Sequence, residues 1–353
     1  MRRIAPLVLS LIVPVILSAC GGDNGGSQPA ASANAMWSRT KPSTTTSSGG
    51  STSTSTSTST SGSSATVSSG PGFPVSGPWM TYYGDASTLG NLSKVANTFR
   101  IMDIDLDPDT GNFAPSDVVT LKNNGQNKVL SYLNLGSCEH WRGYWNQVPS
   151  GFVSCGANKA AQLGSYQGYS DETWMNVGNA DYQNLILNYV APRLVAQGAD
   201  GFYLDNMEIV EHGTSTSNGP CDAACSQGGL DLVRKLRQKY PKMLIVMQNA
   251  TSNVTRLGTT GGVPFSSLLD GVAHEEVYKP TYDSGAETEL LNWKSMNLHP
   301  GGNPFWIATV DYVGTCSDTT DAWSAYSSSR SHGFSPYVSD ASAGQNVVCY
   351  WGF

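Results

Sequence analysis

The chain has 353 residues, of which 39% are hydrophobic and only 13% are charged, and its formal net charge at pH 7 is −7. Four of the 20 basic residues and one of the 27 acidic residues precede residue 78, so residues 78–353 carry a formal charge of −10. This acidic balance argues against nucleic acid as a partner and would attract a cationic ligand. The alternative is that the acidic residues serve solubility, as in many exported proteins.

The first twenty residues have the pattern of a bacterial export signal. Arg2 and Arg3 give a positively charged start, residues 4–17 form an apolar core, and small residues lead to Cys20. This ending resembles a lipoprotein lipobox, in which Cys20 becomes the lipidated N-terminus; an ordinary signal peptide is the alternative. The core is shorter than the roughly 20 apolar residues that span a bilayer. We therefore expect an exported lipoprotein, anchored by its lipid at the outer membrane or cell surface.

Residues 21–77 are rich in Gly, Ser, Thr, Pro and Ala, and residues 51–61 are a nearly pure Ser/Thr alternation. Such a segment has little apolar surface to bury, so we expect a disordered tether. A flexible chain of this length would hold the folded part on the order of 40 Å from the anchor. Residues 78–353 remain as one large domain or two small ones.

Strand-like runs alternate with helical patterns along residues 78–353. The predicted strands are 79–83, 99–104, 128–135, 201–205, 243–248, 271–276, 305–311 and 334–338. The predicted helices are 86–97, 114–124, 180–197, 222–240, 285–297 and 318–332. This alternation implies parallel strands joined by crossovers, and eight such units fit a single (β/α)8 barrel.

A doubly wound open sheet is the alternative fold, but the junction after the first strand lacks a GxGxxG phosphate turn. Residues 139–180 are rich in Trp, Tyr and Gly and show no clear period, so we expect loops over one face of the barrel.

Six cysteines remain when Cys20 is set aside, and an even number in an exported chain suggests disulfides. Fifteen pairings are possible. We favour Cys138–Cys155, Cys221–Cys225 and Cys316–Cys349, because each closes a loop between elements that we expect to be near neighbours. We expect no metal site, since neither a CxxC pair nor a His cluster accompanies these cysteines.

Polar side chains stand where most of the predicted strands end. They are Asp103, Asp105 and Asp107; Ser137 and Glu139; Asp205 and Asn206; Gln248 and Asn249; His274, Glu275 and Glu276; and Asp311 and Tyr312. In a barrel these ends share one face, so carboxylates from several strands would meet there. Hydrolysis of a glycosidic bond needs two carboxyl groups, and aromatic rings from residues 139–180 would stack on sugars. The pattern therefore favours a glycoside hydrolase.

Two other readings of these residues are weaker. Asp103, Asp105 and Asp107 have calcium-loop spacing, but Pro108 and Ala114 stand where that loop needs Gly and Glu. A Ser/His/Asp hydrolase is disfavoured, because the chain has no G-x-S-x-G motif.

Three blocks of the sequence resemble one known family. Residues 128–142, KVLSYLNLGSCEHWR, are similar to its strand-three block, and residues 198–206, GADGFYLDN, are similar to its strand-four block. Residues 273–276, AHEE, resemble its strand-six acidic block. The family is glycoside hydrolase family 114, the endo-α-1,4-polygalactosaminidases. The resemblance implies a (β/α)8 barrel without cofactor that cuts α-1,4-linked galactosamine polymers internally.

The family's two carboxylates fall on Asp205 and Glu275, and the adjacent Glu276 remains an alternative to Glu275. We expect the glutamate to donate a proton and Asp205 to act as nucleophile or base, although the roles could be exchanged. Asn206 would orient Asp205. The residues expected to contact the sugar are Asp103, Tyr132, Glu139, Arg142, Trp174 and Tyr312.

The expected partner is a cationic or partly acetylated amino-sugar polysaccharide, cut by a monomeric enzyme. A second hypothesis is a surface lectin on the same barrel, which would bind the polysaccharide without cutting it. An esterase or a deacetylase is a third, but the first needs a nucleophile elbow and the second a His/Asp metal set.

Overall fold

The computed structural model describes residues 68–341 and 345–353 of the chain. The predicted export signal, its lipidation site Cys20 and most of the predicted tether therefore lie outside the described residues. Within the part that is described, no helix has both the length and the apolar character needed to cross a membrane.

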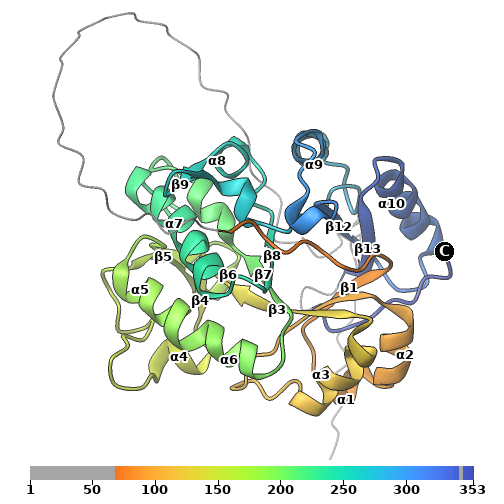
Figure 1. The fold of residues 1–353 in the computed structure, drawn as a ribbon, viewed down its shortest axis with the longest axis horizontal. Coiled ribbons are helices and arrows are strands. Elements are labelled where there is room, and N and C mark those ends of the chain that lie inside the picture. Colours follow the sequence, from red (N-terminus) through yellow and green to blue (C-terminus); the bar gives the residue numbers. More distant parts are fainter. Residues whose placement is uncertain (1–67, 342–344) are drawn as a thin grey trace, which may run out of the picture. The chain divides into compact units, whose positions relative to one another are not determined.

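Eight parallel strands form one sheet whose spatial order follows the chain (Figure 1). They are β1 (Trp79–Tyr82), β2 (Ile101–Ile104), β3 (Lys128–Asn134), β7 (Gly201–Asp205), β8 (Leu244–Gln248), β11 (Gly271–Glu275), β12 (Trp306–Val313) and β13 (Ser335–Asp340). The last strand returns to the first, where Trp79 Nε1 donates to the carbonyl of Ser335 over 2.8 Å. The strands thus make a nearly closed (β/α)8 barrel. All eight predicted strands are confirmed, and the doubly wound alternative is wrong because the strand order never reverses.

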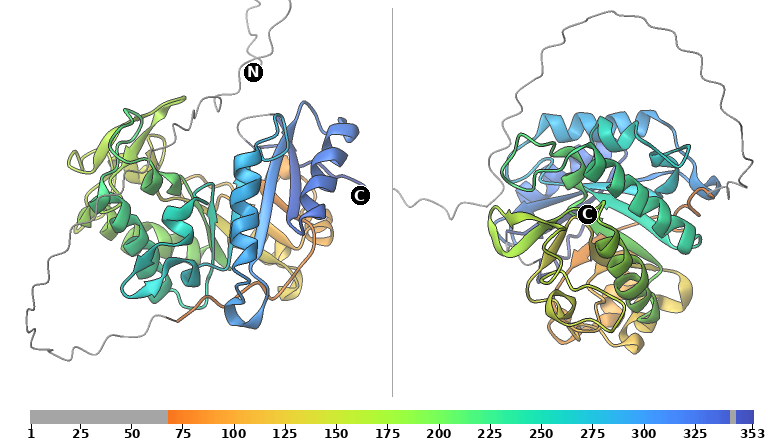
Figure 2. Two further views of the ribbon diagram at one scale, coloured as in Figure 1. Left: turned by 90° about the horizontal axis from the view of Figure 1, so that it is seen from above. Right: turned by 90° about the vertical axis from the view of Figure 1, so that its left-hand side faces the viewer.

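The helices lie outside the strands (Figure 2). The α-helices are α1 (Ala86–Leu89), α2 (Leu92–Thr98), α3 (Pro115–Leu121), α4 (Gly143–Asn146), α5 (Ala180–Leu185), α6 (Ala191–Ala196), α7 (Ala223–Lys239), α8 (Asn253–Arg256), α9 (Ser284–Ser295) and α10 (Thr319–Ser331). A π-helical turn, η2 (Ile186–Val190), joins α5 to α6, and 3-10 turns occur at η1 (Asn123–Gly125), η3 (Met207–Glu211), η4 (Phe265–Leu268) and η5 (Pro300–Gly302).

Local sequence explains where several of these helices begin and end. The side chain of Asp222 accepts from Cys225 N at the start of α7, and Asp283 caps α9 in the same way. The predicted helix over 86–97 is two helices, because Gly90, with φ at 84°, ends α1.

The segment predicted as loops, 139–180, contributes two strands, β5 (Gln162–Tyr166) and β6 (Tyr169–Met175), to an antiparallel sheet whose third strand is β4 (Ser137–Glu139). The loop prediction is wrong here because these strands have no clean alternation: β5 is half-exposed along its length and its pairing with β6 slips in register. A further short hairpin joins β9 (Thr259–Thr260) to β10 (Val263–Pro264).

All three predicted disulfides are confirmed. Cys138–Cys155 ties β4 to the loop before β5, and Cys221–Cys225 crosses the start of α7. Cys316–Cys349 joins the loop after β12 to the C-terminal segment, 33 residues further along the chain.

The folded part begins earlier than residue 78, which corrects the predicted end of the tether. Gly72 N donates to Asp270 Oδ1 over 2.6 Å, and the Phe73 ring is 6% exposed and lies 4.9 Å from Trp306. One aromatic ring and a backbone hydrogen bond thus anchor this segment, and its Ser/Gly/Pro-rich composition does not reveal either contact.

Asp270 and Arg237 form a fully buried ion pair under this segment. Arg237 Nη2 lies 2.6 Å from Asp270 Oδ2, both side chains are 0% exposed, and Ile245 N also donates to the carboxylate. Removing one member leaves an uncompensated buried charge, so Asp270→Ala should lower the free energy of unfolding by about 3–5 kcal/mol. Urea unfolding measures this loss.

Asp321→Ala is the control, because Asp321 is 57% exposed in its pair with Lys279 and should contribute only about 0–1 kcal/mol. Equal losses in the two variants would contradict the role given to the buried pair.

Candidate active site

Asp205 and Glu275 end strands on either side of β8, and one amide at the end of β8 contacts both. Gln248 Nε2 donates to Asp205 Oδ1 over 3.2 Å and to Glu275 Oε2 over 2.8 Å. Those two oxygens are therefore at most about 6 Å apart, the span of two hydrogen bonds. Parallel pairing of β7, β8 and β11 aligns the strand ends and so brings the carboxyl groups together.

Glu275 is held by donors from several parts of the chain. Asn249 Nδ2 donates to Oε2 over 2.8 Å, while Tyr312 OH and Gln345 Nε2 both donate to Oε1. The backbone N–H of Glu275 also donates to Asn249 Oδ1. The chain turns directly after this residue, since Glu276 has φ at 52° and its N–H donates to the carbonyl of Val310. Of the two adjacent glutamates, Glu275 is the one that shares a donor with Asp205.

Asp205 has fewer side-chain donors than Glu275. Tyr132 OH donates to Oδ2 over 3.0 Å, and the Tyr132 ring packs edge-on against Tyr83. Burial, followed by repulsion from Glu275, raises the pKa of Asp205 to about 7. The site therefore retains a proton up to near-neutral pH, so it offers a proton and a carboxylate together.

A third carboxyl group, Glu172 on β6, lies beside this pair. Ser137 Oγ donates to Glu172 Oε2 over 2.5 Å, and Asn206 Nδ2 contacts the same oxygen at 3.4 Å. Burial, followed by repulsion from Glu139, raises the pKa of Glu172 to about 8. The side chain of Asn206 thus turns toward Ser137 and Glu172, and its backbone N–H is the group that faces the Asp205 carboxylate.

Gly136 of the strand-three block has a steric role in this arrangement. A Cβ at this position would lie 1.7 Å from the carbonyl oxygen of Asn206, so only glycine lets the two strand ends approach.

Arg142 and Glu139 are both buried beneath the side chains of the site. Arg142 is 5% exposed; its Nη1 contacts both oxygens of Asp105 at 3.0 and 2.9 Å, and its Nη2 contacts Glu139 Oε1 at 3.2 Å. Asp107 lies 3.4 Å from the same guanidinium, which also lies 5.4 Å from the centre of the Tyr132 ring. This buried network supports Tyr132 and through it Asp205, whereas the sequence predicted direct sugar contacts for Glu139 and Arg142.

Two other predicted sugar contacts are buried among protein groups. Asp103 is 0% exposed and accepts from Tyr83 OH over 2.6 Å. Trp174 is 1% exposed, stacks on Tyr166 at 4.2 Å and donates through Nε1 to Asn218 Oδ1. In this structure neither side chain presents a free face to a ligand. The Trp174 ring packs on Tyr166 where the sequence predicted that it would stack on a sugar.

Sequence reasoning missed three residues near the pair. Glu172 belongs to residues 139–180, which show no clear period. Gln345 follows the last strand, where the sequence has no motif that indicates a site residue. Gln345 Nε2 donates to Tyr312 OH over 2.8 Å as well as to Glu275, and its Oε1 accepts from Thr81. Glu208, on η3, has a pKa raised well above its ordinary value by burial and then by Asp205. In the sequence, the one sign that Glu208 could belong to the site is its position three residues after the end of β7.

The dependence of the Asp205 pKa on Glu275 can be tested directly. Replacing Glu275 by Gln removes the charge that repels the Asp205 carboxylate, so the pKa of Asp205 should fall from about 7. Carbon-detected NMR of labelled aspartate carboxyls across a pH titration measures this. Asp181→Asn, at an exposed position of α5, should leave the Asp205 titration unchanged. An unaltered Asp205 titration in Glu275→Gln would contradict the coupling between the two groups.

The sequence model of glycoside-hydrolase family GH114 matches residues 59–352. Among solved structures, the chain is similar to the glycoside hydrolase domain of PelA from Pseudomonas aeruginosa, with a TM-score of 0.57 and 14% identity over 77% of this chain and 97% of that chain. A variant of that domain gives a TM-score of 0.55 at 15% identity with the same coverage. A search of curated proteins found no match.

The structural similarity supports the barrel fold, and the family match extends over most of the sequence. The resemblance that the three sequence blocks predict is thereby confirmed: the chain belongs to glycoside-hydrolase family GH114.

Proposed function

We propose that this glycoside hydrolase cuts α-1,4-linked galactosamine polysaccharide at internal positions, using Asp205 and Glu275. The observation that carries the proposal is the contact of one amide, Gln248 Nε2, with both carboxyl groups. Two carboxyl groups this close, one able to hold a proton near neutral pH, are what cleavage of a glycosidic bond needs.

The short distance between the two groups supports cleavage with retention of configuration. Retaining enzymes place their carboxyls about 5–5.5 Å apart and inverting enzymes about 6.5–9.5 Å, and the oxygens here are within about 6 Å. In the first step one carboxylate attacks the anomeric carbon while the other group protonates the leaving oxygen, giving a glycosyl ester. In the second step that other group takes a proton from water, which attacks the same carbon and releases the first carboxylate.

From the sequence we expect Glu275 to be the proton donor and Asp205 to be the nucleophile or base. The raised pKa of Asp205 favours the exchanged roles in the free site, because a group with a higher pKa keeps its proton longer. Both assignments of the two roles use Asp205 and Glu275. They predict different products when one of the two carboxyl groups is removed.

Acidic side chains around the pair support a substrate that carries free amino groups. Glu172 and Glu208 have pKa values raised by burial and by neighbouring carboxylates, Glu139 for the first and Asp205 for the second. An ammonium group placed among these carboxyls would stabilise their ionised forms, whereas an acetylated amine would not. We therefore propose that the enzyme prefers polymers with free amines over fully acetylated ones.

Release of oligomers from galactosamine polymer tests the catalytic pair. Asp205→Asn and Glu275→Gln should each lower kcat by about 10²- to 10⁴-fold, since each removes a group that transfers a proton or attacks. Asp181→Asn should retain the wild-type rate, and thermal melting shows whether each variant is folded. A wild-type rate in either site variant would reject the pair. Retention of polymer by the wild type without any new reducing ends would instead support the lectin hypothesis.

Azide assigns the two roles when it is added to alanine variants with an activated substrate. Loss of the nucleophile lets azide attack directly and gives a glycosyl azide of inverted configuration, whereas loss of the acid/base group gives a retained one. NMR of the anomeric proton distinguishes the products. Hydrolysis by the wild type with inversion would contradict the retaining mechanism.

Gln345 should matter to the rate although it lies outside the barrel strands. It donates to the Glu275 carboxylate, and such a bond to a charged group contributes about 1.5–3 kcal/mol. Gln345→Leu should therefore lower kcat roughly ten- to a hundredfold with little change in KM. Gln126→Leu, at an exposed position of the loop before β3, is the matched control. An unchanged kcat in Gln345→Leu would show that the contact does not position Glu275.

A further inference from the structure

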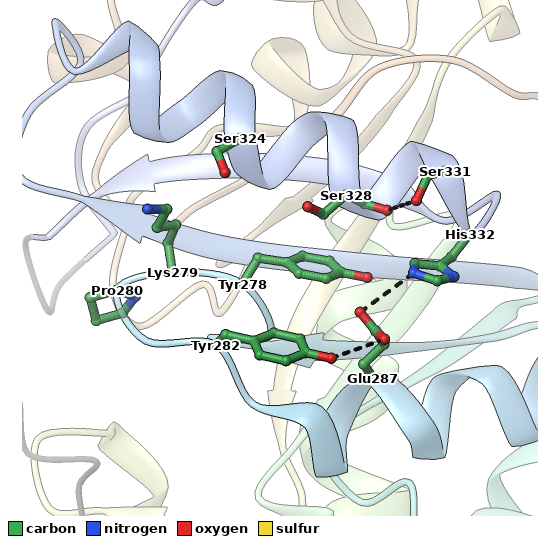
Figure 3. Close-up of a pocket in the computed structure, with 9 residues that line it drawn as sticks. All are labelled: Tyr278, Lys279, Pro280, Tyr282, Glu287, Ser324, Ser328, Ser331 and His332. Atoms are coloured by element: carbon green, nitrogen blue, oxygen red, sulfur yellow. Dashed lines mark hydrogen bonds and ion pairs between the residues drawn. The ribbon is translucent and has the colours of Figure 1, made fainter.

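A hollow of about 440 Å³ lies on the outer wall of the barrel between α9 and α10 (Figure 3). The loop after β11 supplies Tyr278 and Tyr282, α9 supplies Glu287, and α10 supplies one row of serines that ends at His332. None of these residues contacts Asp205 or Glu275 through any hydrogen bond in the described part of the chain.

The two tyrosines form a fixed aromatic platform in this hollow. Tyr278 is only 6% exposed, and its ring lies nearly parallel to that of Tyr282, at 10° and 6.2 Å between centroids. Tyr282 is 56% exposed, yet its hydroxyl donates to Glu287 Oε1 over 3.1 Å. A large exposed ring is therefore already held in place, which lowers the entropy cost of stacking a ligand on it.

Polar groups face the platform from the neighbouring helices. Ser324, Ser328 and Ser331 lie four and three residues apart, so their hydroxyls share one face of α10. Glu287 Oε2 lies 3.5 Å from His332 Nε2 at the end toward which the tyrosine hydroxyls point (Figure 3). The buried hydroxyl of Tyr278 lies at this end, beside the Glu287 carboxylate.

This combination fits a sugar better than other ligands. A pyranose ring presents an apolar C–H face to an aromatic plane and hydroxyls to serine and carboxylate groups. An amino sugar adds a cationic group, which the Glu287 carboxylate would accept. A nucleic acid would meet the Glu287 carboxylate, and the ammonium of Lys279, which also lines the hollow, is already paired with Asp321 over 2.7 Å. An apolar peptide would offer no polar group to the hydroxyls of Ser324 and Ser328.

We propose that this hollow is a second saccharide site, which holds a strand of the amino-sugar polymer away from Asp205 and Glu275. The choice of an amino sugar rests on the proposed function. A second attachment point on one chain raises the effective concentration of polymer at the two carboxyl groups, so it favours long substrates over short ones.

Binding by the full chain in a Glu275→Gln background tests the site without hydrolysis. Adding Tyr282→Ala should weaken retention of galactosamine polymer in affinity electrophoresis about three- to tenfold. Trp323→Ala is the matched control, because Trp323 is an α10 aromatic with similar exposure, 52%, that packs on Phe353 and lies outside the hollow. Equal retention with and without the Tyr282 ring would overturn the site.

Kinetics of the active protein give a second measurement. Tyr282→Ala should raise KM for long polymer by the same factor and leave kcat/KM for short oligomers unchanged, whereas equal losses on both substrates would overturn the proposal. The two proposals fail separately. Tyr282-dependent retention by a wild type that releases no oligomers would reject the hydrolase function and support this site.

Discussion

The shared amide of Gln248 is the contact on which the proposed chemistry depends. Two buried carboxyl groups repel each other when both are ionised, so a site that keeps them close needs a donor between them or a proton on one. This site has both, because Gln248 Nε2 bonds to Asp205 and Glu275 and the pKa of Asp205 is raised to about 7. The contact exists because β7, β8 and β11 are consecutive parallel strands that end at one level.

The side chains around Asp205 and Glu275 fix the positions of these two carboxyl groups. Tyr132 bonds to Asp205 and rests against a buried Arg142 whose charge is balanced by carboxylates on other elements. Such a buried network is costly to break, and it therefore fixes the Tyr132 ring more firmly than packing alone. Gln345 reaches Glu275 from the C-terminal segment, which Cys316–Cys349 joins to the loop after β12.

One loop links Glu275 to the hollow between α9 and α10. Glu275 ends β11, and the loop that follows carries Tyr278 and Tyr282 before α9 begins. Asp311, on the neighbouring strand, accepts from the backbone N–H groups of Tyr278 and Lys279, so the loop is tied to the barrel next to the site. A short, anchored connection of this kind would keep the two proposed binding surfaces at a constant separation, as binding of a long polymer at both requires.

The sequence by itself determined the eight strands, the three disulfides and the placement of Asp205 and Glu275 at strand ends, because these follow from local periodicity and from the shared face of parallel strand ends. Tertiary structure decided which side chains meet. Gln345 contacts Glu275 across 70 residues, Glu172 enters through an antiparallel sheet without clear alternation, and Phe73 anchors a segment whose composition resembles a tether. Arg142 and Trp174 are buried by neighbours that are distant in the chain. A sugar contact must be exposed and a packing residue is buried, but the spacing of residues in the sequence does not show which of the two applies.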